Sequence, residues 1–268
     1  MSRVATFAAG ALAAAGSYAA HRVLTTRVRS PRWERTNHAG DTVTLLEGPS
    51  YVAGAALGAA TSGPAGVVAV VGSGAFGALD DLAGDGASKG LKGHLGAAAH
   101  GKVTTGLVKI VGIGATGLVA AALADRGRDD VATFDTVVGG AVVAGAANLA
   151  NLLDLRPGRA LKVTVLAALP LLLGGGATAP RAAAAAGAAL GVLGPDLAGT
   201  AMLGDTGANA AGALVGTALL GSTGRRGRLA ALVVLAGLTL ASEKVSFTRV
   251  IESTPGLREL DAWGRPAR

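Results

Sequence analysis

Apolar stretches of about 15 to 21 residues recur along the whole chain, and short charged segments separate them. A helix of this length matches the hydrocarbon thickness of a bilayer, and in lipid a helix satisfies its own backbone N–H and C=O groups. The composition agrees, because 50% of the 268 residues are hydrophobic and only 15% are charged, which is too apolar for an ordinary soluble domain. We therefore predict an all-α protein, a polytopic bundle of transmembrane helices.

The apolar stretches predict about nine spans, with a transmembrane domain at 1–243 and a cytoplasmic amphipathic tail at 244–268. The apolar run that ends at Ala20 imitates a secretory signal peptide, but the many similar segments after it indicate a first span. The stretch 49–79 is broken at Ser62-Gly63-Pro64, and it is either two short helices or one long kinked helix. The predicted spans are 4–22, 49–62, 64–79, 105–124, 132–150, 161–175, 181–199, 207–222 and 227–243.

Basic residues fall mainly on one side of this predicted topology. Two short helices at 49–79 place four loops and the tail on the same side, which then holds 17 of the 24 Lys and Arg residues, against 7 opposite. By the positive-inside rule that side is cytoplasmic, so we expect a multi-pass plasma-membrane protein with its N-terminus out and its C-terminus in. The main exception is the opposite loop, which carries Arg225, Arg226 and Arg228. The residues counted as cytoplasmic are Arg22, Arg27, Arg29, Arg32, Arg35, Lys89, Lys92, Lys102, Lys109, Arg156, Arg159, Lys162, Lys244, Arg249, Arg258, Arg265 and Arg268.

Composition also excludes several kinds of chemistry. The chain has no Cys, and therefore no disulfide, thiolate metal site or Cys nucleophile. Its four His residues include no pair at metal-ligand spacing on a helix, which argues against a zinc site. The glycine pattern at 72–77 (Gly-Ser-Gly-Ala-Phe-Gly) matches a dinucleotide-binding fold, but no acid between Asp85 and Asp125 is present to bind the ribose. Close helix packing through small residues explains the 43 glycines better.

Acids at the ends of predicted spans are the first candidates for a functional site. Asp80 and Asp81, with Asp85 close behind, follow the third span at the cytoplasmic interface. Paired carboxylates there suit Mg²⁺ bound to a diphosphate, because this ion takes carboxylate and phosphate oxygens and keeps several waters. The alternative is a solvated loop that ends a helix. Lys109, in the next span, either reaches a phosphate or extends its side chain to the interface.

Further polar groups lie at the same predicted interface. Asn148, Asn151 and Asp154 follow one side of the fifth span, where they indicate either a functional site or interhelical hydrogen bonds. The segment 203–209 (Leu-Gly-Asp-Thr-Gly-Ala-Asn) places Asp205 beside glycines that let a phosphate approach the backbone, unless it is a simple turn. Asp196 is a fourth acid near the membrane, or only a cap of a kinked helix.

Taken in order, these motifs resemble the polyprenyl-phosphate N-acetylhexosamine-1-phosphate transferases (glycosyltransferase family 4), which include phospho-N-acetylmuramoyl-pentapeptide transferase. The resemblance covers roughly residues 30 to 210 and keeps the family's order and sidedness. The matching segments are Asp80-Asp81, Lys109, Asn148-x-x-Asn151-Leu-x-Asp154, Met202-Leu-Gly-Asp205-Thr-Gly207 and Arg35-Thr-Asn37-His-Ala-Gly40.

The resemblance implies Mg²⁺-dependent transfer of a sugar-1-phosphate from a nucleotide-diphosphate sugar to undecaprenyl phosphate or another polyprenyl phosphate. Such a reaction serves cell-envelope polysaccharide or peptidoglycan synthesis. Asp205 would ligate Mg²⁺, for which Mn²⁺ is a substitute, Asp80 and Asp81 would position the metal or the lipid phosphate, and Lys109 would offset phosphate charge. No nucleic-acid partner is expected, and a homodimer is compatible with the resemblance. The residues expected to bind substrate are Asn148, Asn151, Asp154, Arg35 and Asn37.

The sequence also departs from the family pattern. After Asp154 the family continues Gly-x-Asp-Gly, whereas Pro157 here replaces an acid associated with nucleotide recognition. The His-rich motif of the last cytoplasmic loop is missing, because residues 243–268 contain no His. An alternative is therefore an inactive relative that binds polyprenyl phosphate or a lipid-linked intermediate within an envelope-assembly complex. A transporter is disfavoured, since the acids gather at one interface and not at the midplane.

The tail has its own pattern. Apolar and charged residues are interspersed along it, which predicts an amphipathic helix on the cytoplasmic membrane surface. Its apolar residues are Val250, Ile251, Leu257, Leu260 and Trp263.

Overall fold

The computed structural model describes residues 2–37, 40–83 and 104–266. This part of the chain is mostly helical and contains one small two-stranded sheet, so the predicted all-α class is confirmed in its main feature. Several residues discussed above lie outside the described residues. They are Asp85, Lys89, Lys92, Lys102, Arg268 and three of the four His residues, namely His38, His94 and His100.

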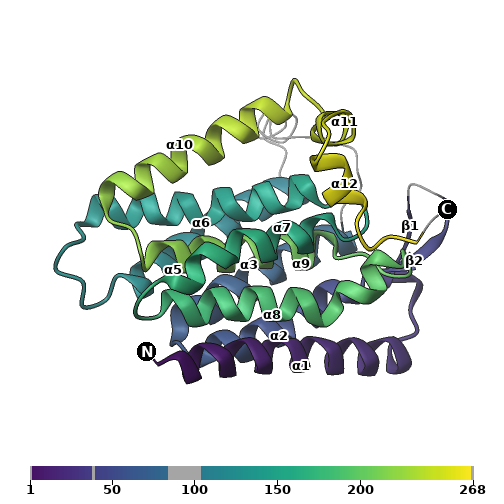
Figure 1. The fold of residues 1–268 in the computed structure, drawn as a ribbon, viewed down its shortest axis with the longest axis horizontal. Helices are drawn as coiled ribbons and strands as arrows, with labels where there is room; N and C mark the ends of the chain where they lie inside the picture. Colours follow the sequence, from purple (N-terminus) through teal and green to yellow (C-terminus); the bar gives the residue numbers. More distant parts are fainter. Residues whose placement is uncertain (1, 38–39, 84–103, 267–268) are drawn as a thin grey trace.

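The main helices run along the long axis of the molecule and pack side by side as a bundle (Figure 1). Helix α1 begins at one end of the bundle, and the C-terminal segment lies at the other (Figure 1). The main helices are α1 (Arg3–Arg27), α2 (Glu47–Ala60), α3 (Pro64–Ala83), α5 (Thr105–Ala124), α6 (Thr133–Leu153), α7 (Arg159–Ala168), α8 (Thr178–Leu197), α9 (Gly204–Leu220) and α10 (Arg225–Ser242). The short elements are η1 (Pro31–Trp33), β1 (Glu34–Thr36), β2 (Thr42–Thr44), η2 (Leu169–Leu173), α11 (Phe247–Ser253) and α12 (Leu257–Ala262).

Each predicted apolar span contains a helix, with one difference in detail. The stretch 49–79, which the sequence left open between two short helices and one kinked helix, forms two helices, α2 and α3, and Gly63 between them has a φ of 95°, which favours glycine. The stretch 161–175 was expected to be one continuous helix, and that prediction is wrong. Helix α7 gives way to the 3₁₀ turn η2, because Pro170 lacks the N–H that would continue the helix.

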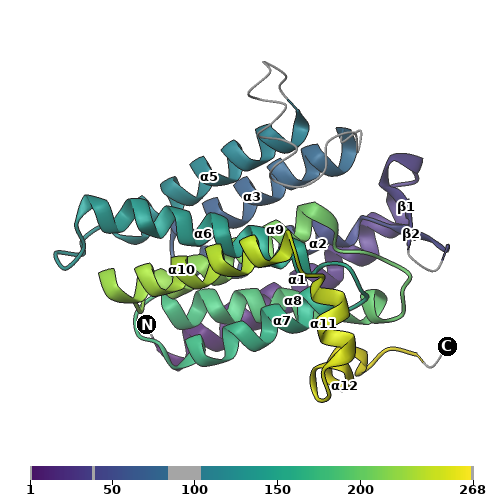
Figure 2. The same ribbon diagram turned by 90° about the horizontal axis from the view of Figure 1, so that it is seen from above.

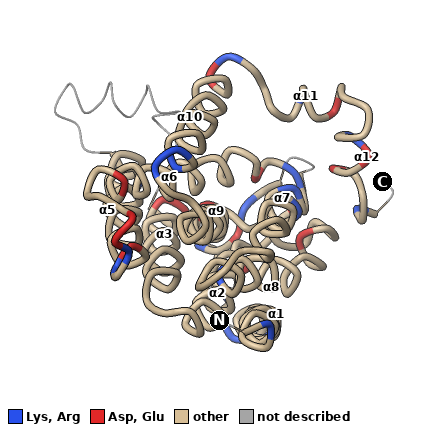
Figure 3. Tube along the Cα trace, turned by 60° about the vertical axis from the view of Figure 1, so that its left-hand side comes forward, with Lys and Arg blue, Asp and Glu red and all other residues tan. Residues whose placement is uncertain are grey.

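Several helices are long and apolar enough to cross a membrane. Among the described residues these are α3, α5 and α6, and the pair α10–α11, bent by 93°, is a fourth candidate. Lys, Arg, Asp and Glu lie mainly near helix ends and in connections, and the helix middles carry other residues (Figure 3). These features are consistent with a membrane protein.

Small residues allow the helices to approach closely. A Cβ on Gly187 of α8 would clash with the backbone of Gly10 in α1, and a Cβ on Gly212 of α9 would clash with Ala146 of α6. The main buried cluster is also rich in alanine, with few large side chains such as Tyr51. The predicted reliance on small residues is therefore confirmed.

The arginines that opposed the predicted orientation are mostly paired with acids. Arg225 forms an ion pair with Asp135 at 2.6 Å, and Arg228, which is fully buried, pairs with Asp125 at 2.5 Å. These contacts join the start of α10 to the end of α5 and the first turn of α6. Local acids thus balance two of the three arginines in this loop.

The tail folds against the bundle, and the prediction of one amphipathic helix is wrong. Pro255 and Gly256 separate α11 from α12, and Gly256 has a φ of 85°. Arg159 at the start of α7 binds the Asp261 carboxylate with two hydrogen bonds of 2.7 and 3.0 Å. Burial alone would raise the pKa of Asp261, but the hydrogen bonds and charge of Arg159 and the charge of Arg265 outweigh it and hold that pKa below its usual value.

Candidate functional site

The candidate site lies at the end of the bundle that carries the tail. The C-terminal ends of α3, α6 and α8 meet the N-terminal ends of α2, α5 and α9 there (Figures 1 and 2). The strands β1 and β2 pair as an antiparallel hairpin, and Thr44 at its end also pairs with Ala201, just before α9. This pairing brings the segment with Arg35 and Asn37 to the same end.

Lys109 joins two of the predicted catalytic acids. Its ammonium group donates a hydrogen bond of 2.7 Å to Asp80 and a second hydrogen bond to Asp205. All three side chains are partly buried, with exposed fractions of 17%, 20% and 25%. Carboxylates from α3 and α9 thus converge on one cationic group, although their residues lie far apart in the sequence.

Asp81 has a different set of contacts from its neighbour Asp80. Its carboxylate accepts hydrogen bonds from the backbone N–H groups of Asp205, at 3.1 Å, and Thr206, at 2.8 Å, and from the Thr206 hydroxyl at 2.6 Å. These are free N–H groups of the first turn of α9, so Asp81 acts as a helix cap supplied by another helix. Arg35 donates to the backbone carbonyl of Asp81 and anchors the hairpin to α3. Asp81 therefore fixes the position of Asp205.

A cavity of about 360 Å³ opens beside these residues. Gly204 lies in the wall of this cavity with a φ of 63°, a backbone conformation that favours glycine. A Cβ at this position would also lie only 3.1 Å from the Asp81 carboxylate, which is a second reason for glycine here. Burial, followed by the charges of Asp196 and Asp205, raises the pKa of Asp154 well above its usual value. The polar side chains that line this cavity are Arg35, Asp81, Asn151, Asp154 and Asp205.

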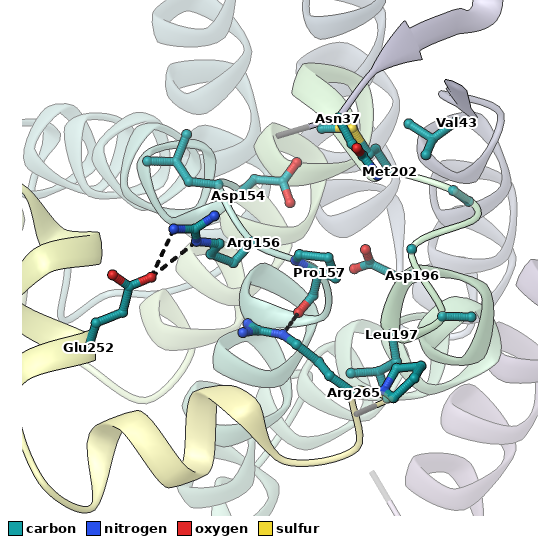
Figure 4. A pocket seen from close by; sticks show the side chains of 15 residues that line it. Asn37, Val43, Asp154, Arg156, Pro157, Asp196, Leu197, Met202, Glu252 and Arg265 are labelled. Carbon is teal, nitrogen blue, oxygen red and sulfur yellow. Dashed lines mark hydrogen bonds and ion pairs between the residues drawn. The ribbon is translucent and has the colours of Figure 1, made fainter. Parts of the chain in front are cut away.

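A second cavity, of about 320 Å³, adjoins the first and shares Asp154, Leu155 and Met202 with it. Asp196 at the end of α8 faces this cavity, and the tail supplies part of the wall (Figure 4). Arg156 pairs with Glu252 of α11 at 2.9 Å, and Arg265 donates to the Pro157 carbonyl at 2.8 Å (Figure 4). Both acidic and guanidinium groups therefore line this cavity, and one of the acids, Glu252, is paired with Arg156.

Most of the predicted site residues meet here. The exception is Asn148, whose amide donates to the Thr239 hydroxyl of α10 at 3.1 Å. That contact is the interhelical hydrogen bond that the sequence left open, and we therefore leave Asn148 out of the proposed site. Asn37 lines only the second cavity. The residues brought to the two cavities or to the Lys109 cluster are Asp80, Asp81, Lys109, Asn151, Asp154, Asp205, Arg35 and Asn37.

Two acids at this end were not assigned a role from the sequence. Asp196 was only a fourth acid near the membrane, and it proves to line the second cavity. Glu47, the first residue of α2, is fully buried. The sequence could have marked Glu47 as a candidate, because it is an acid at the very start of an apolar span, where a charge would be expensive in lipid.

The acids beside Lys109 offer few ligands to a Mg²⁺ ion. No group of three or more acidic or His side chains converges as a complete cage within the described residues. Mg²⁺ commonly keeps several waters and takes only one or two carboxylates, which Asp80 and Asp205 offer around the Lys109 ammonium. Two carboxylates are thus available to a hydrated Mg²⁺, and in this structure the Lys109 ammonium lies between them.

Comparisons with known proteins add no further identification. No family model and no curated protein matches the chain. The resemblance described above therefore depends on the ordered motifs and on their meeting at one site.

Proposed function

We propose that this protein is a nine-span membrane protein that transfers a sugar-1-phosphate from a nucleotide-diphosphate sugar to polyprenyl phosphate, with Mg²⁺ as cofactor. Its site end would face the cytoplasm, with the N-terminus outside. The observation that carries the proposal is the meeting of Asp80, Lys109 and Asp205 beside a cavity lined by Asn151 and Asp154. These residues belong to the motifs that carry the resemblance. They come from four different helices, α3, α5, α6 and α9, and Asp154 is the residue that caps the end of α6.

The arrangement suits phosphoryl transfer between two phosphates. A lipid-phosphate oxygen attacks the phosphorus that bears the sugar, and the bond from that phosphorus to the nucleoside-monophosphate oxygen breaks. Such reactions depend mainly on positioning and on neutralising the charge of the transferred group. Arg35 supplies positive charge at the cavity, Lys109 supplies it beside Asp205, and Asp81 holds Asp205 in place. Mg²⁺ held by Asp80 and Asp205 would polarise phosphate oxygens.

The surface near the site is compatible with a lipid substrate. In the tail, Val250, Leu257 and Leu260 are each more than 40% exposed, and Trp263 is 70% exposed. Exposed apolar groups beside basic residues suit the membrane interface, where Trp side chains are common. The tail would then lie on the cytoplasmic leaflet, next to the second cavity, whose wall it helps to form.

The experiment is an exchange assay in lipid nanodiscs with undecaprenyl phosphate, Mg²⁺ and a panel of nucleotide-diphosphate sugars. We expect release of a nucleoside monophosphate and formation of a lipid-linked sugar. Both products should disappear without Mg²⁺ and in the Asp205→Asn variant. The matched control is Asp129→Asn, which changes an exposed acid at the opposite end of the bundle.

A second candidate is a non-catalytic protein that binds polyprenyl phosphate or a lipid-linked intermediate. One observation favours it, since the Lys109 ammonium lies between the two carboxylates that would hold Mg²⁺. The missing His motif agrees with this candidate. Wild-type protein that binds undecaprenyl phosphate in the same nanodiscs, but turns over no donor, would replace the transferase proposal with this one.

A further inference from the structure

A third cavity, of about 500 Å³, lies between the end of α1 and the hairpin of β1 and β2. It shares no lining residue with the first two cavities, and no step of the proposed reaction uses it. The end of α1 and the hairpin lie at the same end of the bundle (Figure 1). The polar and aromatic residues of its lining are Thr25, Arg29, Ser30, Trp33, Glu34 and Thr44.

Arginines without a partner surround this cavity. Arg29 lines it, and Arg27 and Arg32 are chain neighbours of lining residues. Arg22 lies about one helical turn before Thr25. The guanidinium groups of these four exposed arginines form no ion pair and donate no hydrogen bond in the described part of the chain. The end of α1 therefore carries positive charge that no described acid neutralises.

The lining also contains hydrogen-bonding groups that are unused within the described residues. The Ser30 hydroxyl and the Trp33 indole N–H make no hydrogen bond there. Glu34 is the one acid among the described residues of the lining, and it is exposed and does not pair with Arg29. A ligand with an anionic group for Arg29 and a hydroxyl that donates to Glu34 would satisfy both charged side chains.

An exposed face of α1 leads from this cavity along the helix. Val4, Ala11, Tyr18 and Thr25 are spaced by seven residues, or about two turns, and therefore share one face. All four are exposed, Val4 at 76% and Tyr18 at 58%. In a membrane such a face contacts acyl chains, and basic and Trp side chains at its end are typical of the headgroup region. The cavity thus lies where the headgroup of a lipid along α1 would be.

We propose that this cavity binds the headgroup of an anionic phospholipid of the phosphatidylglycerol class. Arg29 binds the phosphodiester, Ser30 and Trp33 donate hydrogen bonds to its oxygens, and Glu34 accepts from the hydroxyls of the headgroup glycerol. The neighbouring arginines select an anionic over a zwitterionic lipid, because each basic residue near a membrane surface strengthens binding to anionic lipid by about fivefold. Lipid binding here requires the membrane placement given in the proposed function, but not the reaction. A bound lipid would also hold α1 to the hairpin, whose Arg35 lines the first cavity.

The test uses the full chain in nanodiscs of phosphatidylcholine with a small fraction of phosphatidylglycerol brominated on its acyl chains, which quenches nearby Trp fluorescence. The chain has two Trp residues, so a Trp263→Phe background leaves Trp33 as the reporter. We expect saturable quenching of Trp33, and the added change Arg29→Gln should weaken binding about fivefold. The matched control Arg126→Gln removes an exposed arginine after α5, at the opposite end of the bundle, and should leave quenching unchanged.

Three comparisons identify the ligand. Brominated phosphatidylethanolamine at the same fraction should quench Trp33 less, and Glu34→Gln should not weaken phosphatidylglycerol binding, whereas it would weaken binding of an ammonium headgroup. Unlabelled undecaprenyl phosphate at an equal fraction should not restore the emission.

Equal quenching by the two brominated lipids, or equal affinity with and without Arg29→Gln, would overturn the proposal. Recovery of emission with undecaprenyl phosphate would also overturn it and assign the cavity to that lipid. The samples contain no nucleotide-diphosphate sugar, so failure of the exchange reaction leaves this result intact.

Discussion

The contacts of Asp80 and Asp81 predict that two neighbouring aspartates have different roles. Both carboxylate oxygens of Asp81 accept hydrogen bonds from the first turn of α9. Replacing Asp81 by Asn puts an amide NH₂ in place of one of these oxygens, and an NH₂ group cannot accept a hydrogen bond. Loss of a helix cap costs about 1 kcal/mol, and a hydrogen bond to a charged group contributes about 1.5 to 3 kcal/mol. Since the Asn oxygen still accepts from one donor, we expect Asp81→Asn to lower the free energy of unfolding by about 2 kcal/mol.

The matched variant is Asp80→Asn. Asp80 is partly exposed, and Lys109 keeps its bond to Asp205 when Asp80 is neutral, so we expect a loss of no more than about 1 kcal/mol. Both variants would be unfolded by SDS in mixed micelles and followed by far-UV circular dichroism. A double-mutant cycle of Asp81→Asn with Thr206→Val should give a coupling energy of about 1 kcal/mol. Equal destabilisation by the two Asn variants, or simple additivity with Thr206→Val, would refute the assignment of Asp81 as a cap.

Three other predictions concern the scaffold. Arg228→Met should lower the free energy of unfolding by about 3 kcal/mol, because it leaves the Asp125 carboxylate enclosed without its partner, and the same SDS titration measures it. Gly77→Ala should destabilise the fold by about 1 to 3 kcal/mol through a clash with the α9 backbone, whereas Gly114→Ala, with open space around it, should stabilise by about 0.5 kcal/mol. The tail should detach at low pH. Because the folded pKa of Asp261 is depressed, its stabilising effect is present above the unfolded pKa of about 4 and is lost as the pH falls through the folded value. Limited proteolysis of the tail across this pH range should show the release, and Asp261→Asn should show it already at neutral pH.

The helical class and most helix positions could be predicted from the sequence. Apolar length determines where a helix can form in lipid, and the break Ser62-Gly63-Pro64 is a local signal that separates two helices. Pro170 was available as a signal of the same kind but was not used, and Pro195 lies inside α8, so proline alone does not fix where a helix ends. The order of the predicted spans also sufficed to propose which acids belong to one site. Successive spans run in opposite directions, so every second connection returns to the same end of the bundle. That argument places Asp80, Asp154 and Asp205 together without any knowledge of their contacts.

The individual contacts depended on tertiary structure. Successive residues of a helix point about 100° apart, so Asp80 and Asp81 face different neighbours, and only the position of α9 decides which of them meets Lys109 and which caps a helix. Asn148 looked equivalent to Asn151 in the sequence, yet the packing of α10 turns it to Thr239.

By itself the sequence determined a mostly helical chain with several helices long and apolar enough to cross a membrane, because lipid restricts the backbone and penalises charge. The tertiary structure alone decided that Glu47 is fully buried with no hydrogen-bond partner among the described residues, since a carboxylate is paired or left unpaired only by what other helices bring to it.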